Sequence, residues 1–445
     1  MAKMKNAIWI MSDQHRGQAL SCNGDPNVST PNLDNMAVYG INFANAVGGF
    51  PLCCPYRGSM LTGLYPHKCV PGHEYPLPGN QRTIAHVFRD HGYHTAYVGK
   101  WHLDGFHEGN GRAAYHIVPP GRRGGFDYWI GYENNNSQWD SWVHGGADNE
   151  TEPYRLPGYE TDALTDLFID HLKKTADNDE PFFAVLSVQP PHNPYAAPAE
   201  YMKNHNPESL KLRPNVPDIR RIQERARPAL AGAYAMIENL DYNIGRIIKF
   251  LMETGLYFDT HILFFSDHGD MHGSHGHFLK TSPYEESIRV PFIISGEQPA
   301  YEGRRRGRSN IPINHVDIAP TTLGLCGIDA PDNMEGTDLS WVRLADRPKK
   351  YTPDSAYLQS VIPTGHDDCI GKPWRGIVTT DGWKYACFEH MPWMLHNLNE
   401  DPYELANLAH YPVYWDKLRE LNERTKKWAA ETGDSFIFPE TDSYK

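Results

Sequence analysis

The stretch Ala7-Ile8-Trp9-Ile10-Met11 is followed directly by Ser12-Asp13-Gln14. Five apolar residues without a polar interruption indicate a strand buried on both faces, as in a parallel sheet. The polar residues come where that strand should end. Because ligands of open α/β sheets bind outside the carboxyl ends of the strands, this stretch predicts both a fold class and the place of a site.

Four more short apolar runs repeat this pattern, over 94–98, 182–188, 262–265 and 290–294. Between them, apolar residues recur at helical spacing, first over 163–172 and more strongly over 230–251. Alternating strands and helices predict an α/β fold with a large, mainly parallel sheet sandwiched by helices.

The pattern changes after about residue 340. Short antiparallel strands are predicted over 355–361, 375–380 and 383–389, with a turn at Asp381-Gly382 and a terminal helix over 413–428. We therefore expect a large N-terminal domain over 1–340, which would hold the site. A smaller C-terminal α+β subdomain with an antiparallel sheet is expected over 341–445.

The overall charge limits the possible partners. The chain has 445 residues and a net charge of −13, from 42 basic and 55 acidic side chains. This balance argues against nucleic acid as a partner, and an anionic substrate would need a local basic site. No apolar run is long enough to span a membrane, and no signal peptide is visible. The expected location is cytoplasmic, or periplasmic or secreted if a signal peptide was removed.

The segment Cys53-Cys54-Pro55-Tyr56-Arg57 begins a predicted helix that ends at Thr62-Gly63. Proline suits the first turn of a helix, and a nucleophile there faces free N–H groups and the positive end of the helix dipole. Such a place suits a tetrahedral oxyanion, and Arg57 adds a forked cation. The alternative is a buried structural cysteine pair. A disulfide between adjacent cysteines would be strained, so we expect free thiols or a modified Cys53.

A second acidic segment, Asp267-His268-Gly269, follows the run at 262–265. Alone it would more often be a simple turn. Asp13 and Gln14 follow the first strand, and the two polar segments could meet across the sheet. Together they would offer oxygen ligands to Ca²⁺ or Mg²⁺.

Two further polar segments follow predicted strands. Lys100 and His102 come after the run at 94–98, and residues two apart in extended backbone point the same way, with Trp101 packing inward. His192 lies in a proline-rich segment after the run at 182–188. A lone histidine in a loop is more often inert, but its place after a core strand favours a role in the site.

These motifs, in this order, resemble the type I (formylglycine-dependent) sulfatases of the alkaline phosphatase superfamily. The core Cys-x-Pro-x-Arg is intact at Cys53, Pro55 and Arg57, whereas Tyr56 stands where the family usually has serine or a similarly small residue. Further matching stretches lie at 29–34, 273–280, 283–291 and 395–408.

The resemblance implies hydrolysis of a sulfate ester. Cys53 would be oxidised to formylglycine by a formylglycine-generating or anaerobic sulfatase-maturating enzyme, and its hydrate would attack sulfur. The implied catalytic residues are Cys53, Arg57, Lys100, His102, His192 and Lys280. Lys100 and Lys280 would bind the sulfate, His102 would take a proton from the hydrate, and His192 would lie near the leaving group. The implied metal ligands, for Ca²⁺ or Mg²⁺, are Asp13, Gln14, Cys53, Asp267 and His268.

The substrate is predicted to be a sulfated carbohydrate. The long polar segment 105–160 combines aromatic and Asn side chains, which suit sugar rings, although most of its aromatics are expected to close a local core. Four residues of the C-terminal subdomain could line the leaving-group pocket: His366, Asp367, Asp368 and Arg375.

Three alternatives remain. A phosphonate monoester or phosphodiester hydrolase of the same superfamily can share formylglycine, but the Lys100 and His102 pair favours sulfate. A metal-dependent phosphatase or mutase would need a Ser or Thr nucleophile. A non-catalytic glycan-binding protein would not need the complete polar set.

Overall fold

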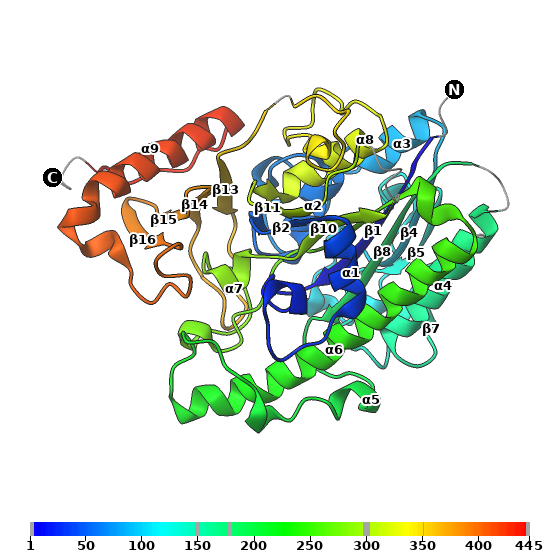
Figure 1. The fold of residues 1–445 in the computed structure, drawn as a ribbon, viewed down its shortest axis with the longest axis horizontal. Helices are drawn as coiled ribbons and strands as arrows, with labels where there is room; N and C mark the ends of the chain where they lie inside the picture. Colours follow the sequence, from blue (N-terminus) through cyan, green and yellow to red (C-terminus); the bar gives the residue numbers. More distant parts are fainter. Residues whose placement is uncertain (1–3, 147–151, 177–179, 297–302, 350, 442–445) are drawn as a thin grey trace.

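The computed structural model describes residues 4–146, 152–176, 180–296, 303–349 and 351–441. Within them, ten strands form one sheet in the order β11-β2-β10-β9-β1-β8-β4-β5-β6-β7 (Figure 1). The strands that carry the predicted site are β1 (Asn6–Asp13), β4 (His94–Lys100), β8 (Phe182–Pro191) and β9 (Thr260–Ser266). The others are β2 (Ile41–Phe43), β5 (Tyr128–Tyr132), β6 (Trp142–Gly145), β7 (Tyr154–Arg155), β10 (Phe292–Gly296) and β11 (Gly307–Ser309).

The first strand lies at the centre of this sheet. It pairs in parallel with β8 and β9, so that Ile8 faces Ala184 on one side and Ile262 on the other. All eight residues of β1 are buried, as its apolar run predicts. β4 pairs in parallel with β8, whereas β10 runs antiparallel to β9. The prediction of a mainly parallel sheet is therefore confirmed.

Helices cover both faces of the sheet (Figure 1). Ala7, Trp9 and Met11 point into a core shared with α2 (Cys53–Thr62), α3 (Ile84–Asp90) and α8 (Ile318–Leu325). Ile8 and Ile10 point into the opposite core, shared with α1 (Pro31–Tyr39), α4 (Glu160–Ala176) and α6 (Arg220–Glu253). Two short helices, α5 (Ala199–Met202) and α7 (Glu285–Ile288), complete this part. Alternate β1 side chains thus anchor two separate apolar layers.

The segment 105–160, expected to be a long loop, contains the strands β5, β6 and β7. That expectation was wrong because β5 pairs in parallel with β4 and is covered on both sides. Trp129 lies in one core and Tyr132 in the other. These two aromatics are core residues, but they belong to the two main apolar layers and not to a local core of the segment, while Trp139 is 46 % exposed.

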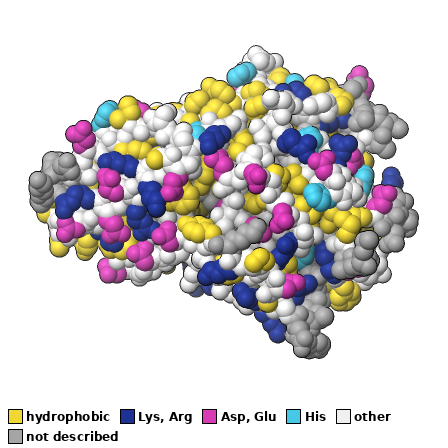
Figure 2. All heavy atoms as spheres, turned by 90° about the horizontal axis from the view of Figure 1, so that it is seen from above, with side chains coloured by type: hydrophobic (Ala, Val, Ile, Leu, Met, Phe, Trp, Pro, Cys, Tyr) yellow, Lys and Arg dark blue, Asp and Glu magenta, His cyan; other side chains and the backbone are white. Residues whose placement is uncertain are grey.

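The C-terminal part forms its own antiparallel sheet of β13 (Ser355–Ser360), β14 (Trp374–Thr379), β15 (Trp383–Phe388) and β16 (Met391–Asn397). Helix α9 (Trp415–Thr432) packs Leu418 and Leu421 against Ile377 and Tyr385. The predicted C-terminal antiparallel sheet is confirmed, although β16 was not recognised as a strand. Basic and acidic side chains alternate over this lobe, at the left of Figure 2, and pair locally along α9.

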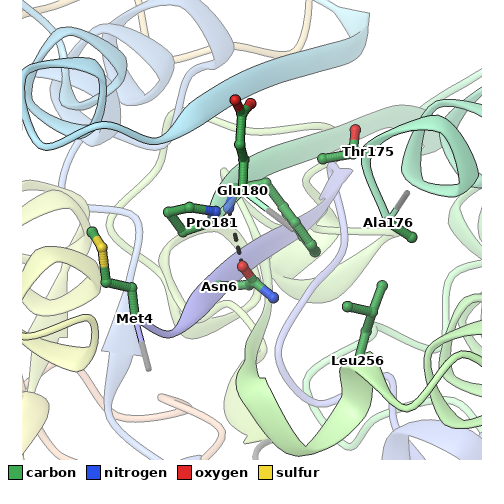
Figure 3. Close-up of a pocket in the computed structure, with 8 residues that line it drawn as sticks. Met4, Asn6, Thr175, Ala176, Glu180, Pro181 and Leu256 are labelled. Atoms are coloured by element: carbon green, nitrogen blue, oxygen red, sulfur yellow. Dashed lines mark hydrogen bonds between the residues drawn. The ribbon is translucent and has the colours of Figure 1, made fainter. Parts of the chain in front are cut away.

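A short two-stranded pairing joins β3 (Ala46–Val47) to β12 (Ile313–Asn314). No helix among the described residues is long and apolar enough to cross a membrane. A cavity of about 400 Å³ lies at the amino ends of β1 and β8, and Figure 3 shows Asn6, Pro181 and Leu256 around it. This cavity lies at the opposite end of these strands from the predicted site. Ligands of open α/β sheets bind at the carboxyl ends of the strands, so the cavity is disfavoured as the functional site.

Candidate active site

The predicted nucleophile position begins a buried helix. Cys53 is the first residue of α2, and the helix ends at Gly63, whose φ of 67° is left-handed. The Cys53 Sγ lies 3.2 Å from both Lys280 Nζ and His268 Nε2. Cys53 and Cys54 are free thiols, as expected. Tyr56, which departs from the family pattern, is buried and stacks on His315 at 5.4 Å between ring centres, so its larger side chain occupies the core.

Asp13, at the end of β1, forms ion pairs with two buried cations. Its Oδ2 lies 2.8 Å from Lys100 Nζ and 3.0 Å from Arg57 Nη2. Burial alone would raise the pKa of Asp13, but the surrounding cations, of which Lys100 acts most strongly, hold it well below its usual range. Asp13 is therefore ionised although it is fully buried.

Gln14 and Asp267 turn free oxygen atoms toward the same place. The Gln14 backbone N–H donates to Asp267 Oδ1 at 3.0 Å, and Gln14 Nε2 donates to Asp270 Oδ2 at 2.6 Å. Gln14 Oε1 and Asp267 Oδ2 are buried and have no hydrogen-bond partner among the described residues, although Arg57 Nη2 lies 3.5 Å from the latter. Buried oxygens without partners are costly unless something binds them.

The predicted metal ligands fit a divalent cation. One ligand atom from each of Asp13, Cys53, Asp267 and His268 lies within 4.8 Å of the others. Carboxylate and amide oxygens are the preferred ligands of Ca²⁺ and Mg²⁺, and Gln14 Oε1 would add one more.

Two histidines have their tautomers set by backbone carbonyls. His268 Nδ1 lies 3.0 Å from the Gly269 carbonyl, and His192 Nδ1 lies 2.8 Å from the Asn193 carbonyl. Each Nδ1 therefore carries the proton, and each Nε2 offers its lone pair to Lys280 Nζ at 3.2 Å. Burial lowers the pKa of His268 to about 4 and that of His192 well below its usual range, so both rings are neutral.

Lys100 and His102 reach the site by different backbone conformations. Lys100 ends β4 and is fully buried, and Trp101 packs into the core as expected. His102 has a φ of 56°, so simple alternation along an extended strand does not place it. Burial lowers the pKa of His102 well below its usual range, which keeps its imidazole neutral and able to accept a proton.

Arg57 ties these strands together. Its Nη1 donates to the Lys100 carbonyl at 2.8 Å and to Ser187 Oγ at 2.9 Å. Three cations, Arg57, Lys100 and Lys280, thus surround the two carboxylates Asp13 and Asp267. This arrangement suits a bound anion, which the chain's net negative charge would otherwise repel.

The predicted leaving-group residues separate in the structure. The His366 ring lies 4.5 Å from the His73 ring, which in turn lies 5.4 Å from the His102 ring. Asp368 lies 2.5 Å from Arg225 Nη2. Arg375 is buried and pairs with Asp434 at 2.6 Å, so its guanidinium is held by the C-terminal segment.

Sequence reasoning missed His73 and Asp270. Asp270 orients Gln14 and also accepts from the Tyr195 hydroxyl at 2.5 Å. It stands three residues after Asp267, so its place after β9 was a usable signal. His73 lies in a Gly- and Pro-rich segment with no strand before it, and no sequence pattern marked it.

The amides of segment 105–160 are largely used among themselves. Gln189 Nε2 donates to Asn134 and Asn136, and its Oε1 accepts from the backbone of Asn135 and Asn136. Buried Glu160 accepts from Tyr132 and Asn135. This internal bonding weakens the case that these amides bind sugar hydroxyls.

Comparison with known proteins agrees with this geometry. Residues 5–328 match the family described as Sulfatase, and residues 273–431 match N-sulphoglucosamine sulphohydrolase, C-terminal. The chain therefore belongs to the sulfatase family, in the alkaline phosphatase superfamily, and is a sulfuric ester hydrolase.

Individual relatives cover most of the chain. An ulvan-active sulfatase from Formosa agariphila is 38% identical over 439 residues, which is 97% of this chain and 82% of that protein. The crystal structure of yidJ from Bacteroides fragilis has a TM-score of 0.86 and 29% identity, covering 100% of this chain and 98% of that one. A phosphonate monoester hydrolase from Agrobacterium radiobacter has a TM-score of 0.77 and 23% identity, covering 96% of each chain, and shares the fold.

Proposed function

We propose that this sulfatase releases inorganic sulfate from a sulfated carbohydrate, using formylglycine at position 53 and a divalent cation, Ca²⁺ or Mg²⁺. The observation that carries the proposal is the position of Cys53, which faces Lys280 and His268 at 3.2 Å from the first turn of a buried helix. The ulvan-active relative supports a carbohydrate substrate.

The unmodified side chain is poorly suited to attack. Burial, followed by the charge of Asp13, raises the pKa of the Cys53 thiol to about 11, so it stays protonated at neutral pH. Hydrated formylglycine would supply one hydroxyl that takes the sulfate and a second whose deprotonation releases it. A cation at the predicted ligand set would draw charge from the sulfate oxygens.

The chain's own residues bind and orient the ester. Lys100 and Lys280 are placed to hold sulfate oxygens, where charge shifts in the transition state. Arg57 braces Asp13 and thereby fixes the site between β1 and β4. The Lys280–His192 pair holds a proton in a hydrogen bond of 3.2 Å, and this pair would protonate the departing sugar oxygen.

His102 would act in the second half of the reaction. Its neutral ring can take the proton of the second hydroxyl as the bond between carbon and the sulfate oxygen breaks. The carbon–oxygen double bond of the aldehyde then re-forms, and sulfate leaves. Water restores the hydrate for the next cycle.

A sulfate-release assay tests this proposal. Protein with a confirmed aldehyde at position 53, by peptide mass, is given a panel of sulfated oligosaccharides, with Cys53→Ala as the control. Release by the parent alone supports a carbohydrate sulfatase. Hydrolysis of phosphonate monoesters or phosphodiesters, without sulfate release from any glycan, would favour the alternative that shares this fold.

A further inference from the structure

A second cluster of metal-ligating side chains lies beside the proposed nucleophile. Cys54 follows Cys53 in α2, His73 lies in the segment between α2 and α3, and His102 follows β4. One ligand atom from each of these residues lies within 4.8 Å of the other two. The mechanism above uses only His102, so Cys54 and His73 have no assigned role.

The distances within this cluster resemble those around a bound ion. Cys54 Sγ lies 3.8 Å from His73 Nδ1. In a tetrahedral zinc site, bonds of 2.3 Å to sulfur and about 2.0 Å to nitrogen separate those two atoms by about 3.5 Å. The rings of His73 and His102 stand at 89° to each other, with centres 5.4 Å apart, so small movements would bring three ligand atoms around one point.

Burial and missing hydrogen-bond partners also indicate a metal site. Cys54 is fully buried and His102 is 3 % exposed. His102 Nδ1 is buried and has no hydrogen-bond partner among the described residues. The other nitrogen of His73, Nε2, lies 3.8 Å from Glu74 Oε1. This distance is too long for a hydrogen bond, so His73 Nε2 is also buried without a hydrogen-bond partner among the described residues.

We propose that Cys54, His73 and His102 form a second metal site, selective for an ion that prefers thiolate and imidazole, such as Zn²⁺. With formylglycine in place of Cys53, the neighbouring set of Asp13, Gln14, Asp267 and His268 offers mainly oxygen and suits a hard cation instead. Two adjacent sites of different ligand chemistry would therefore bind different ions. The fourth zinc position would be left to water.

The site has a consequence for catalysis, and this part rests on the proposed function. A neutral imidazole has a single nitrogen lone pair, so an ion held by His102 would occupy the lone pair that must take the proton of the second hydroxyl. Sulfate release would then stop although substrate could still bind. Zn²⁺ would thus be an inhibitor acting through the residue next to the nucleophile.

Cobalt absorption tests binding without any activity. Co²⁺ bound to a thiolate gives a charge-transfer band, and Cys53→Ala protein removes the neighbouring thiol from the measurement. With Ca²⁺ in excess, we expect one Co²⁺ per chain and the thiolate band. Cys54→Ser in the same background should abolish the band, whereas Cys69→Ser, which removes another buried thiol, should keep it.

Opposite outcomes would overturn the site. Absence of the band in Cys53→Ala protein, or a band that survives Cys54→Ser, contradicts the assignment. Cobalt that binds without a thiolate band, and is lost with Asp267→Asn but kept with His73→Gln, would lie in the hard-cation cluster.

Inhibition is measured separately on aldehyde-loaded enzyme. The Zn²⁺ concentration for half-inhibition, relative to each variant's own zinc-free rate, should rise at least about tenfold in Cys54→Ser. Equal sensitivity would refute the inhibitory role. If no sulfatase activity exists but the cobalt band behaves as expected, the proposed function fails while the metal site stands.

Discussion

Two buried clusters of charged side chains in this protein differ in how their cations and carboxylates balance. The active-site cluster sets three cations, Arg57, Lys100 and Lys280, around two carboxylates, Asp13 and Asp267. It leaves two buried oxygens, on Gln14 and Asp267, without hydrogen-bond partners among the described residues. Such a cluster needs a ligand to be complete.

The second cluster joins α7 to the C-terminal sheet. Glu285 receives Arg289 at 2.8 Å, Glu286 receives Arg213 at 2.7 Å, and Glu404 pairs with Lys384. Lys384 also lies 3.3 Å from Glu285. Three carboxylates therefore face three cations, and each carboxylate has its own partner. Glu286 Oε2 is also buried without a hydrogen-bond partner among the described residues, so the contrast indicates that charge balance, rather than burial or partner count, separates the site from a structural network.

The largest expected effect is on the active-site cluster. Cys53→Ala should lower sulfate release by on the order of 10⁴-fold or more, because the nucleophile is lost. Its thermal unfolding should stay close to that of the parent, since alanine suits a helix start. Steady sulfate release by purified Cys53→Ala would contradict the site. Cys69→Ala, at another buried cysteine, should keep turnover.

The second cluster should show the reverse behaviour, a loss of stability without a loss of activity. Lys384→Met leaves Glu404 buried without its cation, so the free energy of unfolding should fall by about 3–5 kcal/mol. Urea unfolding measures this change, and activity per folded molecule should persist. Lys426→Met removes an exposed pair with Glu423 on α9 and should change stability by less than about 1 kcal/mol. Equal changes in the free energy of unfolding for the two variants would contradict a stabilising role for the second cluster.

His192 shares a hydrogen bond with the cation Lys280, and its substitution tests whether this pair serves catalysis. His192→Ala should lower the rate on an unactivated sugar sulfate by about 10²-fold or more, because the leaving oxygen needs a proton. An aryl sulfate with an acidic phenol leaves without that proton, so its hydrolysis should fall much less. The ratio of the two rates is the measurement. An equal loss on both esters would remove His192 from the acid role.

Much of this architecture could be predicted from the sequence. The apolar runs that became β1, β4, β8 and β9 needed no tertiary information, because strands buried on both faces read as continuous apolar stretches. The polar residues that follow them therefore fell at one edge of the sheet. Lys280 is different, since only the resemblance to sulfatases linked it to Cys53.

What the sequence missed depended on contacts between distant segments. β5 gains its strand conformation by pairing with β4, and its glycine-rich flanks hid it. His73 comes near the site only because the segment after α2 folds back toward β4. Arg375 was expected in the leaving-group pocket, but its pair with Asp434, 59 residues later, cannot be read from spacing.

A third kind of buried ionisable group, the neutral histidine, sharpens the comparison with the paired clusters. His171, on α4, is 7 % exposed, stacks on Tyr128 at 3.9 Å and lies 3.1 Å from His94. Burial lowers its pKa from 6.5 to about 4. His171 gains no counter-charge. Acid should therefore lower the stability of the protein through His171 at pH values where the carboxylates of the paired clusters are still ionised.

The sign of that effect follows from proton binding. Between pH 6.5 and about 4 the unfolded chain binds a proton at His171 and the native protein does not, so the free energy of unfolding falls as pH falls through this window. The full shift corresponds to roughly 3 kcal/mol at about 1.4 kcal/mol per pH unit. His171→Phe keeps a ring on Tyr128 but cannot titrate, so its stability should depend less on pH by up to that amount. Urea unfolding at several pH values measures the difference, with the exposed His410→Phe as control. Parallel pH profiles for parent and His171→Phe would show that the pKa of His171 is the same in the native and the unfolded protein.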